Sequence, residues 1–102
     1  MIVVTGSVWA RPDTIAAVLA LSLEHVRRSR TEPGCLLHTV HLDAEDPLRV
    51  VFLEHWEDEA ALTCHFAVPA SRAFVRELAA LAEGRPEMRV FEASEKNLGT
   101  GL

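Results

Sequence analysis

The sequence of 102 residues lacks the features that mark a membrane protein or a secreted one. Its apolar runs are all shorter than the ~20 residues that a membrane-spanning helix requires. Met1 leads directly into a strand-like pattern, whereas a secretion signal would begin with a basic segment and end in a cleavage site. The sequence therefore predicts a cytoplasmic protein with no membrane partner. Its hydrophobic share of 49% is still enough for the core of one ordinary domain.

Basic residues are also scarce. Lys and Arg total 10 against 15 Asp and Glu, which gives a formal net charge of −5. Proteins that bind nucleic acids or anionic membranes do so through clustered Lys and Arg. The one local cluster is Arg27, Arg28 and Arg30, and Glu24 and Glu32 flank it, so we interpret it as a solvated helix end. No nucleic-acid partner is expected.

Cysteine and glycine-rich motifs are nearly absent. The two cysteines, Cys35 and Cys64, stand in no spacing typical of a metal or redox site, and we expect both to be buried and reduced. The chain contains no glycine-rich nucleotide fingerprint. His38, His41 and His55 are candidate metal ligands, but His38 and His41 are three apart on an expected strand and point to opposite faces. Neither a metal nor an organic cofactor is therefore expected.

What is present is an alternation of strand and helix patterns. β-branched runs with a period of two predict strands, and apolar stripes at helical spacing predict helices. The expected elements are a strand over 2–9, a helix over 12–30, strands over 35–42 and 49–56, a helix that starts near Trp56, a helix over 70–83 and a strand over 88–93. This order predicts an α+β fold, the ferredoxin-like βαββαβ arrangement with a four-stranded antiparallel sheet. Residues 1–93 would form the domain and 94–102 a polar tail.

Local signals fix several of these boundaries. Asp58 suits the N-cap of the helix after Trp56. Glu32-Pro33-Gly34 ends the first helix, because a residue before proline avoids helical geometry. Polar residues and a proline over 43–47 predict a hairpin loop. Val68-Pro69 separates the two later helices, and Gly84 is placed as the C-terminal cap of the second one.

Both faces of the expected sheet are apolar. In the third strand Val50, Phe52 and Trp56 lie on one side, and Val51 and Leu53 lie on the other. Helices on one face leave the second face in water, where alternating polar residues would be normal. The simplest cover is the same face of another copy, so the sequence predicts a homodimer built through its sheet faces.

One group of residues suggests chemistry. Helical spacing from Ala61 and Leu62 turns His65 and Phe66 inward, so His65 borders the same interior space as Trp56. An imidazole titrates near neutral pH and can act as a base, although a core histidine bonded to a backbone carbonyl fits the same pattern. Trp56 suits stacking on a flat aromatic substrate, or simple packing.

Several short patterns connect the chain to a known family: Glu32-Pro33-Gly34-Cys35-Leu36, Asp46-Pro47, Glu54-His55-Trp56, Ala61-Leu62 with His65, and Val68-Pro69. With these patterns the chain resembles the antibiotic biosynthesis monooxygenase family of dimeric α+β barrels, which includes quinol monooxygenases. The similarity runs from residue 2 to about 93. It departs from the family at positions 70 and 71, where many members have a second histidine–aromatic pair, and in having no tyrosine.

The resemblance implies a cofactor-independent monooxygenase that oxidises a quinol or a polycyclic aromatic with O2. In such a reaction the electron-rich substrate anion reduces oxygen itself, so the protein supplies a dry cavity, a base and groups that hold the anion. His65 is the catalytic candidate. The expected substrate-binding residues are Trp56, Phe52, Glu54, Phe66 and Phe74. The alternative is a non-catalytic dimeric module of the same fold that binds a small molecule or acts in stress.

Overall fold

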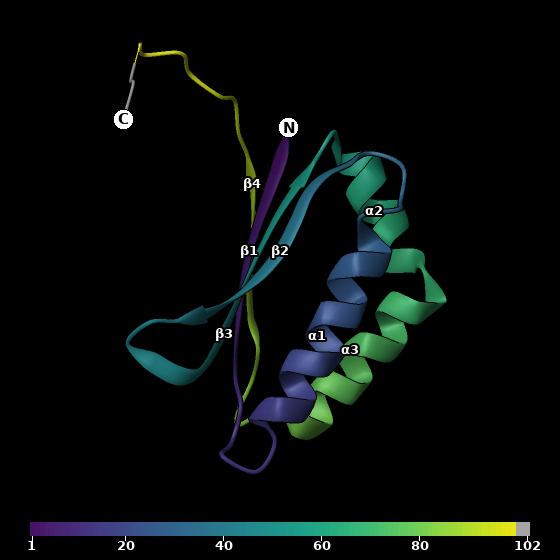
Figure 1. Ribbon diagram of the computed structural model, residues 1–102. Coiled ribbons are helices and arrows are strands. Elements are labelled where there is room, and N and C mark those ends of the chain that lie inside the picture. The colour runs from purple at the N-terminus through teal and green to yellow at the C-terminus, as the bar shows by residue number, and fades with distance from the viewer. Residues whose placement is uncertain (100–102) are drawn as a thin grey trace.

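The computed structural model describes residues 1–99, and its elements follow the expected order (Figure 1). In chain order they are β1 (Ile2–Trp9), α1 (Ile15–Ser29), β2 (Cys35–Asp43), β3 (Asp46–Trp56), α2 (Glu59–Ala67), α3 (Pro69–Leu81) and β4 (Glu87–Glu92). The strands form one four-stranded antiparallel sheet in the order β2-β3-β1-β4. This confirms the ferredoxin-like α+β fold. Of the predicted tail, 94–99 contain no helix or strand, and 100–102 lie outside the described residues.

All three helices lie on one face of the sheet (Figure 1). Strand β3 shows the consequence of the two-residue period, because Phe52, Glu54 and Trp56 are buried under the helices while Val51 and Leu53 are only partly buried on the opposite face. The pairing of β1 with β3 extends this division across the sheet. The inner face therefore carries the core, and the outer face has no cover within residues 1–99.

The core consists of two apolar clusters on the inner face. The larger one joins α1 and α3 to the sheet and includes Val18, Val26 and Val50, all 0% exposed. The smaller one contains Ile2, Val4, Trp56 and Leu62, and it fixes α2 against the ends of β1 and β3. None of the helices within residues 1–99 combines the length and the apolar character needed to cross a membrane.

Two element boundaries differ from the sequence prediction by three residues, and the others differ by at most two. Strand β3 begins at Asp46 instead of residue 49, because pairing with β2 continues to Asp43↔Asp46 and leaves a turn of only two residues. Pro47 is tolerated there because the register with β1 starts only at Arg49. Helix α1 begins at Ile15 instead of residue 12, since 12–14 form a turn.

The predicted signals at the helix ends have mixed outcomes. Asp58 is the N-cap of α2, and its Oδ1 accepts a hydrogen bond from the backbone N of Ala61 at 2.8 Å. Val68 is extended and separates α2 from α3, as predicted, and Pro69 is the first residue of α3. The prediction that Gly84 caps α3 is wrong, because the helix already ends at Leu81. Gly84 has a φ of 73° and shapes the turn toward β4.

Both cysteines are free, as expected, but they are less buried than expected. Cys35 is half-buried, and burial raises the pKa of its thiol. Cys64 is exposed, so the prediction of a buried side chain is wrong for this residue. Its neighbours Leu62 and His65 occupy the buried stripe of α2, which turns Cys64 to the outer side of the helix.

Candidate functional site

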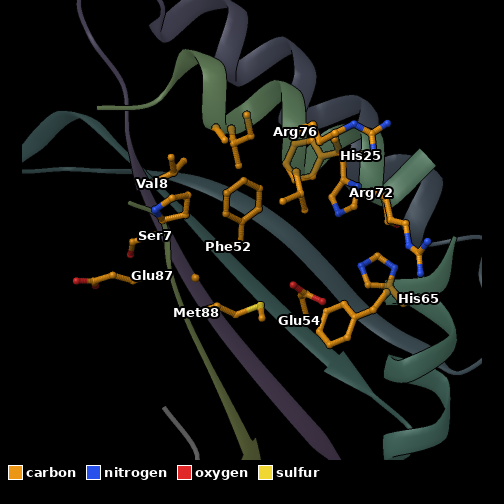
Figure 2. A pocket seen from close by; sticks show the side chains of 18 of the residues that line it. Ser7, Val8, His25, Phe52, Glu54, His65, Arg72, Arg76, Glu87 and Met88 are labelled. Atoms are coloured by element: carbon orange, nitrogen blue, oxygen red, sulfur yellow. The ribbon is translucent and has the colours of Figure 1, made fainter. Parts of the chain in front are cut away.

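A cavity of about 700 Å³ lies between α3 and the inner face of the sheet (Figure 2). Its lining is mainly apolar, and Val8, Phe52 and Glu54 contribute to it from β1 and β3. Met88, on the edge strand β4, lines the cavity and is 57% exposed. The cavity is therefore open near β4, while its inner end reaches buried polar residues between the helices and the sheet.

His65 projects from the last turn of α2 into this inner end and is 3% exposed. Its Nδ1 atom lies 2.8 Å from Oε1 of Glu32. An ionised carboxylate only accepts hydrogen bonds, so in the neutral ring Nδ1 of His65 carries the proton and Nε2 keeps a free lone pair. His65 is therefore oriented as a proton acceptor.

Glu32 lies in the turn after α1, where Arg28 holds its carboxylate. Nη1 of Arg28 donates to Oε2 of Glu32 at 3.1 Å. Nη2 of the same guanidinium donates to Nδ1 of His25 at 2.8 Å and to Oγ of Ser71 at 3.2 Å. Arg28 therefore connects α1, the following turn and α3 around the inner end of the cavity.

His25 is a buried, neutral imidazole. Burial, and then the nearby His38, His65 and Arg28, lower its pKa from 6.5 to about 3. Because an arginine only donates, Nδ1 of His25 accepts from Arg28, and Nε2 carries the proton of the neutral ring. His25 and His65 thus have opposite tautomers, and the unoccupied Nε2 of His25 is a donor.

His38 comes from β2 and is 1% exposed. Neither of its ring nitrogens has a hydrogen-bond partner within residues 1–99. Its Nε2 lies 3.3 Å from Oε1 of Glu54, but the angles at these two atoms are outside the range of a hydrogen bond. Buried polar side chains are paired in the large majority of cases, so an unpaired one beside a cavity is available to a ligand.

Glu54 is buried below these rings, and its Oε1 accepts a hydrogen bond from Nε1 of Trp56 at 2.8 Å. Burial alone would raise the pKa of Glu54, but the contacts with His38 and Trp56 outweigh it, so the pKa lies below its usual value. Trp56 itself is 0% exposed and lies outside the cavity wall. Its ring packs behind His65, with 4.6 Å between ring centroids, and is not available for stacking on a ligand.

The three buried histidines form one cluster. Ring centroids are 5.3 Å apart for His25 and His38, 5.3 Å for His25 and His65, and 5.6 Å for His38 and His65. One ring nitrogen from each histidine lies within 4.8 Å of the others. Figure 2 shows His25 and His65 at the same end of the cavity, with Glu54 nearby. The arrangement offers both a proton acceptor and a hydrogen-bond donor to one ligand.

The structure brings most of the predicted site residues to the cavity. His65, Glu54, Phe52, Phe66 and Phe74 all line it. The expectation that Phe66 points inward is wrong, because its side chain is 43% exposed at the rim of the cavity. The ring of Phe74 stacks on the imidazole of His25, with 3.9 Å between ring centroids.

The three histidines that the sequence suggested as metal ligands do not come together. His38 faces the helices, whereas His41 and His55 pair with residues of the outer face, as the strand period predicts. Sequence reasoning missed His25 and Glu32. The apolar stripe of the first helix was a usable signal for His25, since Val26 is next to it and Ser22 precedes it by one helical turn.

Known proteins share this fold and sequence. Residues 1–77 match the model of the antibiotic biosynthesis monooxygenase family. A solved structure from Deinococcus radiodurans, described as a candidate antibiotic biosynthesis monooxygenase, has a TM-score of 0.93 at 26% identity and covers 99% of this chain and 100% of that one. Another solved antibiotic biosynthesis monooxygenase is 32% identical, with a TM-score of 0.85 and coverage of 93% of this chain and 100% of its own.

A relative in Synechocystis, an uncharacterised protein, is 32% identical over 94 residues, which is 92% of this chain. The chain spans 64% of the length of that relative. The family match includes every histidine of the cluster together with Glu32 and Glu54. Because the family model covers most of the sequence and the fold agrees with solved members, the chain belongs to the antibiotic biosynthesis monooxygenase family.

Proposed function

We propose that this protein is a cofactor-independent monooxygenase that oxidises a flat, electron-rich aromatic substrate, a quinol or a polycyclic phenol, with O2. Membership of the family supports oxygen chemistry in general. The observation that carries the specific proposal is the contact of buried His65 with the partly buried Glu32, 2.8 Å apart, at the inner end of a largely apolar cavity. A base in a water-poor site is what this reaction requires of a protein.

In the proposed reaction, Nε2 of His65 accepts the proton of the substrate hydroxyl. Glu32 stabilises the imidazolium that forms, because its carboxylate already accepts the hydrogen bond from Nδ1. The substrate anion then transfers electrons to O2 and forms a carbon–oxygen bond. The peroxide anion takes the proton back from the imidazolium of His65, and collapse of the resulting hydroperoxide gives a quinone-type product and water. One oxygen atom enters the product and the other leaves as water, so no external reductant is needed.

The apolar lining would hold the aromatic rings. Phe52 lies on the floor of the cavity and Phe66 at its rim, which allows a flat substrate to enter from the side of β4 and reach His65. Trp56 supports the site indirectly, since it packs behind His65 and donates to Glu54.

The test is oxygen uptake with an anthrone or a quinol, measured for the wild type and for His65→Ala. We expect the substitution to lower the rate by about 10²- to 10⁴-fold, the usual contribution of a general base. His41→Ala is the matched control, because this histidine is exposed and is not among the residues that line the cavity. Thermal unfolding of the same samples separates a loss of chemistry from a loss of folded protein.

Full turnover per folded molecule in a destabilised His65→Ala variant would remove His65 from the reaction. Aromatic binding by the wild type without any oxygen uptake would instead favour the non-catalytic binding module.

We also propose that two copies associate through their outer sheet faces. Support comes from the partly buried apolar side chains on that face, such as Val51 and Leu53, with no helix covering them within residues 1–99. A dimer of this kind would leave the cavities of both copies open, since each cavity lies on the helix side of its own sheet.

A further inference from the structure

The two histidines whose tautomers are fixed offer opposite groups to a ligand. Nδ1 of His65 is engaged by Glu32, and Nδ1 of His25 is engaged by Arg28. The remaining nitrogen of each ring is Nε2, a lone pair in His65 and an N–H in His25. A hydroxyl group has both a proton to give and an oxygen that accepts, so it matches this pair. A group that only donates or only accepts would satisfy one ring and leave the other unpaired.

The third histidine adds a site without a partner. His38 has two ring nitrogens that lack hydrogen bonds within residues 1–99, although the side chain is 1% exposed. A buried polar group in this state lowers stability unless something pairs with it. Because the side chain lines the cavity, a ligand oxygen can provide that partner.

The spacing of the cluster fits a single bound oxygen atom. Ring nitrogens up to 4.8 Å apart can all lie about 2.8 Å from one central atom, which is a hydrogen-bond length. Bonds of about 2.0–2.1 Å to a tetrahedral metal would bring the nitrogens to roughly 3.4 Å from one another. A metal would also need the lone pair of Nε2 in His25, and the hydrogen bond from Arg28 keeps a proton there.

We propose that His25, His38 and His65 together bind one oxygen atom of the ligand, the ionisable hydroxyl of a phenol or enol. His65 accepts the proton, and His25 donates a hydrogen bond to the oxygen that becomes negative. His38 supplies a further hydrogen bond from its unpaired ring. This inference rests on the proposed function, because it names the substrate group that the base acts on, and it adds His25 and His38 as residues that select that group.

In this step the proton moves only between the ligand and the histidine cluster. The O–H bond of the ligand breaks, and its proton moves to Nε2 of His65. The ligand becomes an anion and His65 becomes an imidazolium, so the total charge does not change. The anion then accepts hydrogen bonds from N–H groups that were present before the proton moved, which is the condition for efficient stabilisation of developing charge.

The test uses 4-nitro-1-naphthol, whose anion absorbs at a longer wavelength than the neutral form and which O2 does not readily oxidise. Binding to the wild type is expected to raise the fraction of anion at a fixed pH. The methyl ether of the same compound is the matched probe, because it has the ring system but no proton to lose. We expect it to bind at least 10-fold more weakly.

Two substitutions separate binding from folding. His38→Leu removes the imidazole, so we expect about 10- to 100-fold weaker binding of the naphthol per folded molecule. The melting temperature is expected to fall as well, because the buried carboxylate of Glu54 loses the neighbour that favours its charged form. His25→Leu is expected to weaken binding by a similar factor, whereas His25→Gln is expected to restore much of it. Glutamine keeps an acceptor for Arg28 and a donor for the ligand. His41→Ala is the control and should bind like the wild type.

Each result either supports the proposed hydroxyl-binding site or overturns it. Wild-type affinity and wild-type anion fraction in both His38→Leu and His25→Leu would overturn the proposal. Stoichiometric binding of Co²⁺ with a tetrahedral absorption spectrum, lost in His38→Leu, would overturn it in favour of a metal site. Because the naphthol assay needs no turnover, the anion site can be confirmed even if no oxygen uptake occurs. Conversely, oxygen uptake with unaffected His25 and His38 variants would leave only the proposed function standing.

Discussion

The proton acceptor at the inner end of the cavity owes its chemistry to its neighbours. His65 lies on α2, but Glu32 in the turn after α1 fixes its tautomer, and Arg28 fixes Glu32. The same arginine fixes the tautomer of His25 through its other nitrogen. One guanidinium therefore determines which of two imidazoles donates and which accepts.

Glu32→Gln tests the positioning role of the carboxylate. The amide keeps the size of the side chain but removes the charge that stabilises an imidazolium, so we expect kcat to fall by about 10- to 100-fold while KM changes little. Glu24→Gln, on an exposed position of α1, is the control. Equal losses of kcat and of folded protein would show that Glu32 acts only on stability.

His25 makes stability depend on pH. Its pKa is about 3 in the folded protein and 6.5 when unfolded, so between these values the unfolded chain binds the extra proton. The stabilisation is complete above pH 6.5 and is lost as the pH falls toward 3, at up to about 1.4 kcal/mol per pH unit. Urea unfolding at pH 6.5 and 5.0 should show an extra loss of roughly 2 kcal/mol in the wild type relative to His25→Gln. Parallel losses in both proteins would contradict this assignment.

At the scale of elements, the turn between α1 and β2 sets the geometry of the site. Gly34 follows Glu32 closely and has a φ of 81°, and its carbonyl accepts a hydrogen bond from the backbone N of Glu57 at 2.8 Å. A Cβ atom at Gly34 would lie 2.6 Å from Cβ of Ala61 on α2. The turn and α2 are therefore in direct contact, which keeps Glu32 within reach of His65.

Gly34→Ala and Gly84→Ala form a matched pair. Both glycines have positive φ, which costs an alanine about 1 kcal/mol, but only Gly34 has a neighbour within 4 Å of the added atom. We expect Gly34→Ala to lower the free energy of unfolding by about 2–4 kcal/mol and to reduce turnover, because α2 must shift relative to the turn. Gly84→Ala should cost about 1 kcal/mol with turnover unchanged. Equal effects in chemical denaturation would argue against the contact with Ala61.

Most elements were predictable because local rules determine them. Strand alternation, the Asp58 cap and the Val68-Pro69 break depend on residues a few positions apart, and the inward direction of His65 follows from helical spacing alone. The partners of His65 were not predictable in this way. Glu32 is 33 residues distant, and the contact depends on how a turn packs against a helix. The burial of Trp56 behind His65 likewise depends on the packing of α2.

At the scale of the whole molecule, only one face of the sheet is covered. The helices cover the inner face, and the outer face presents the apolar side chains Val3, Trp9, Leu37, Val51, Leu53 and Phe91. Of these, Phe91 is 47% exposed. Folded monomers rarely expose a large apolar patch, and such patches often mark interaction sites.

Leu53→Glu tests the proposed homodimer at the centre of this face, because β3 is an inner strand and Leu53 pairs with Thr5 on one side and Thr39 on the other. Sedimentation of the wild type at micromolar concentration should give about twice the mass of one chain. A buried, unpaired carboxylate would oppose association, so Leu53→Glu should sediment as a folded monomer. Ala80→Glu, on the exposed side of α3, should remain dimeric. A wild type that is a stable monomer at this concentration would refute association through the sheet.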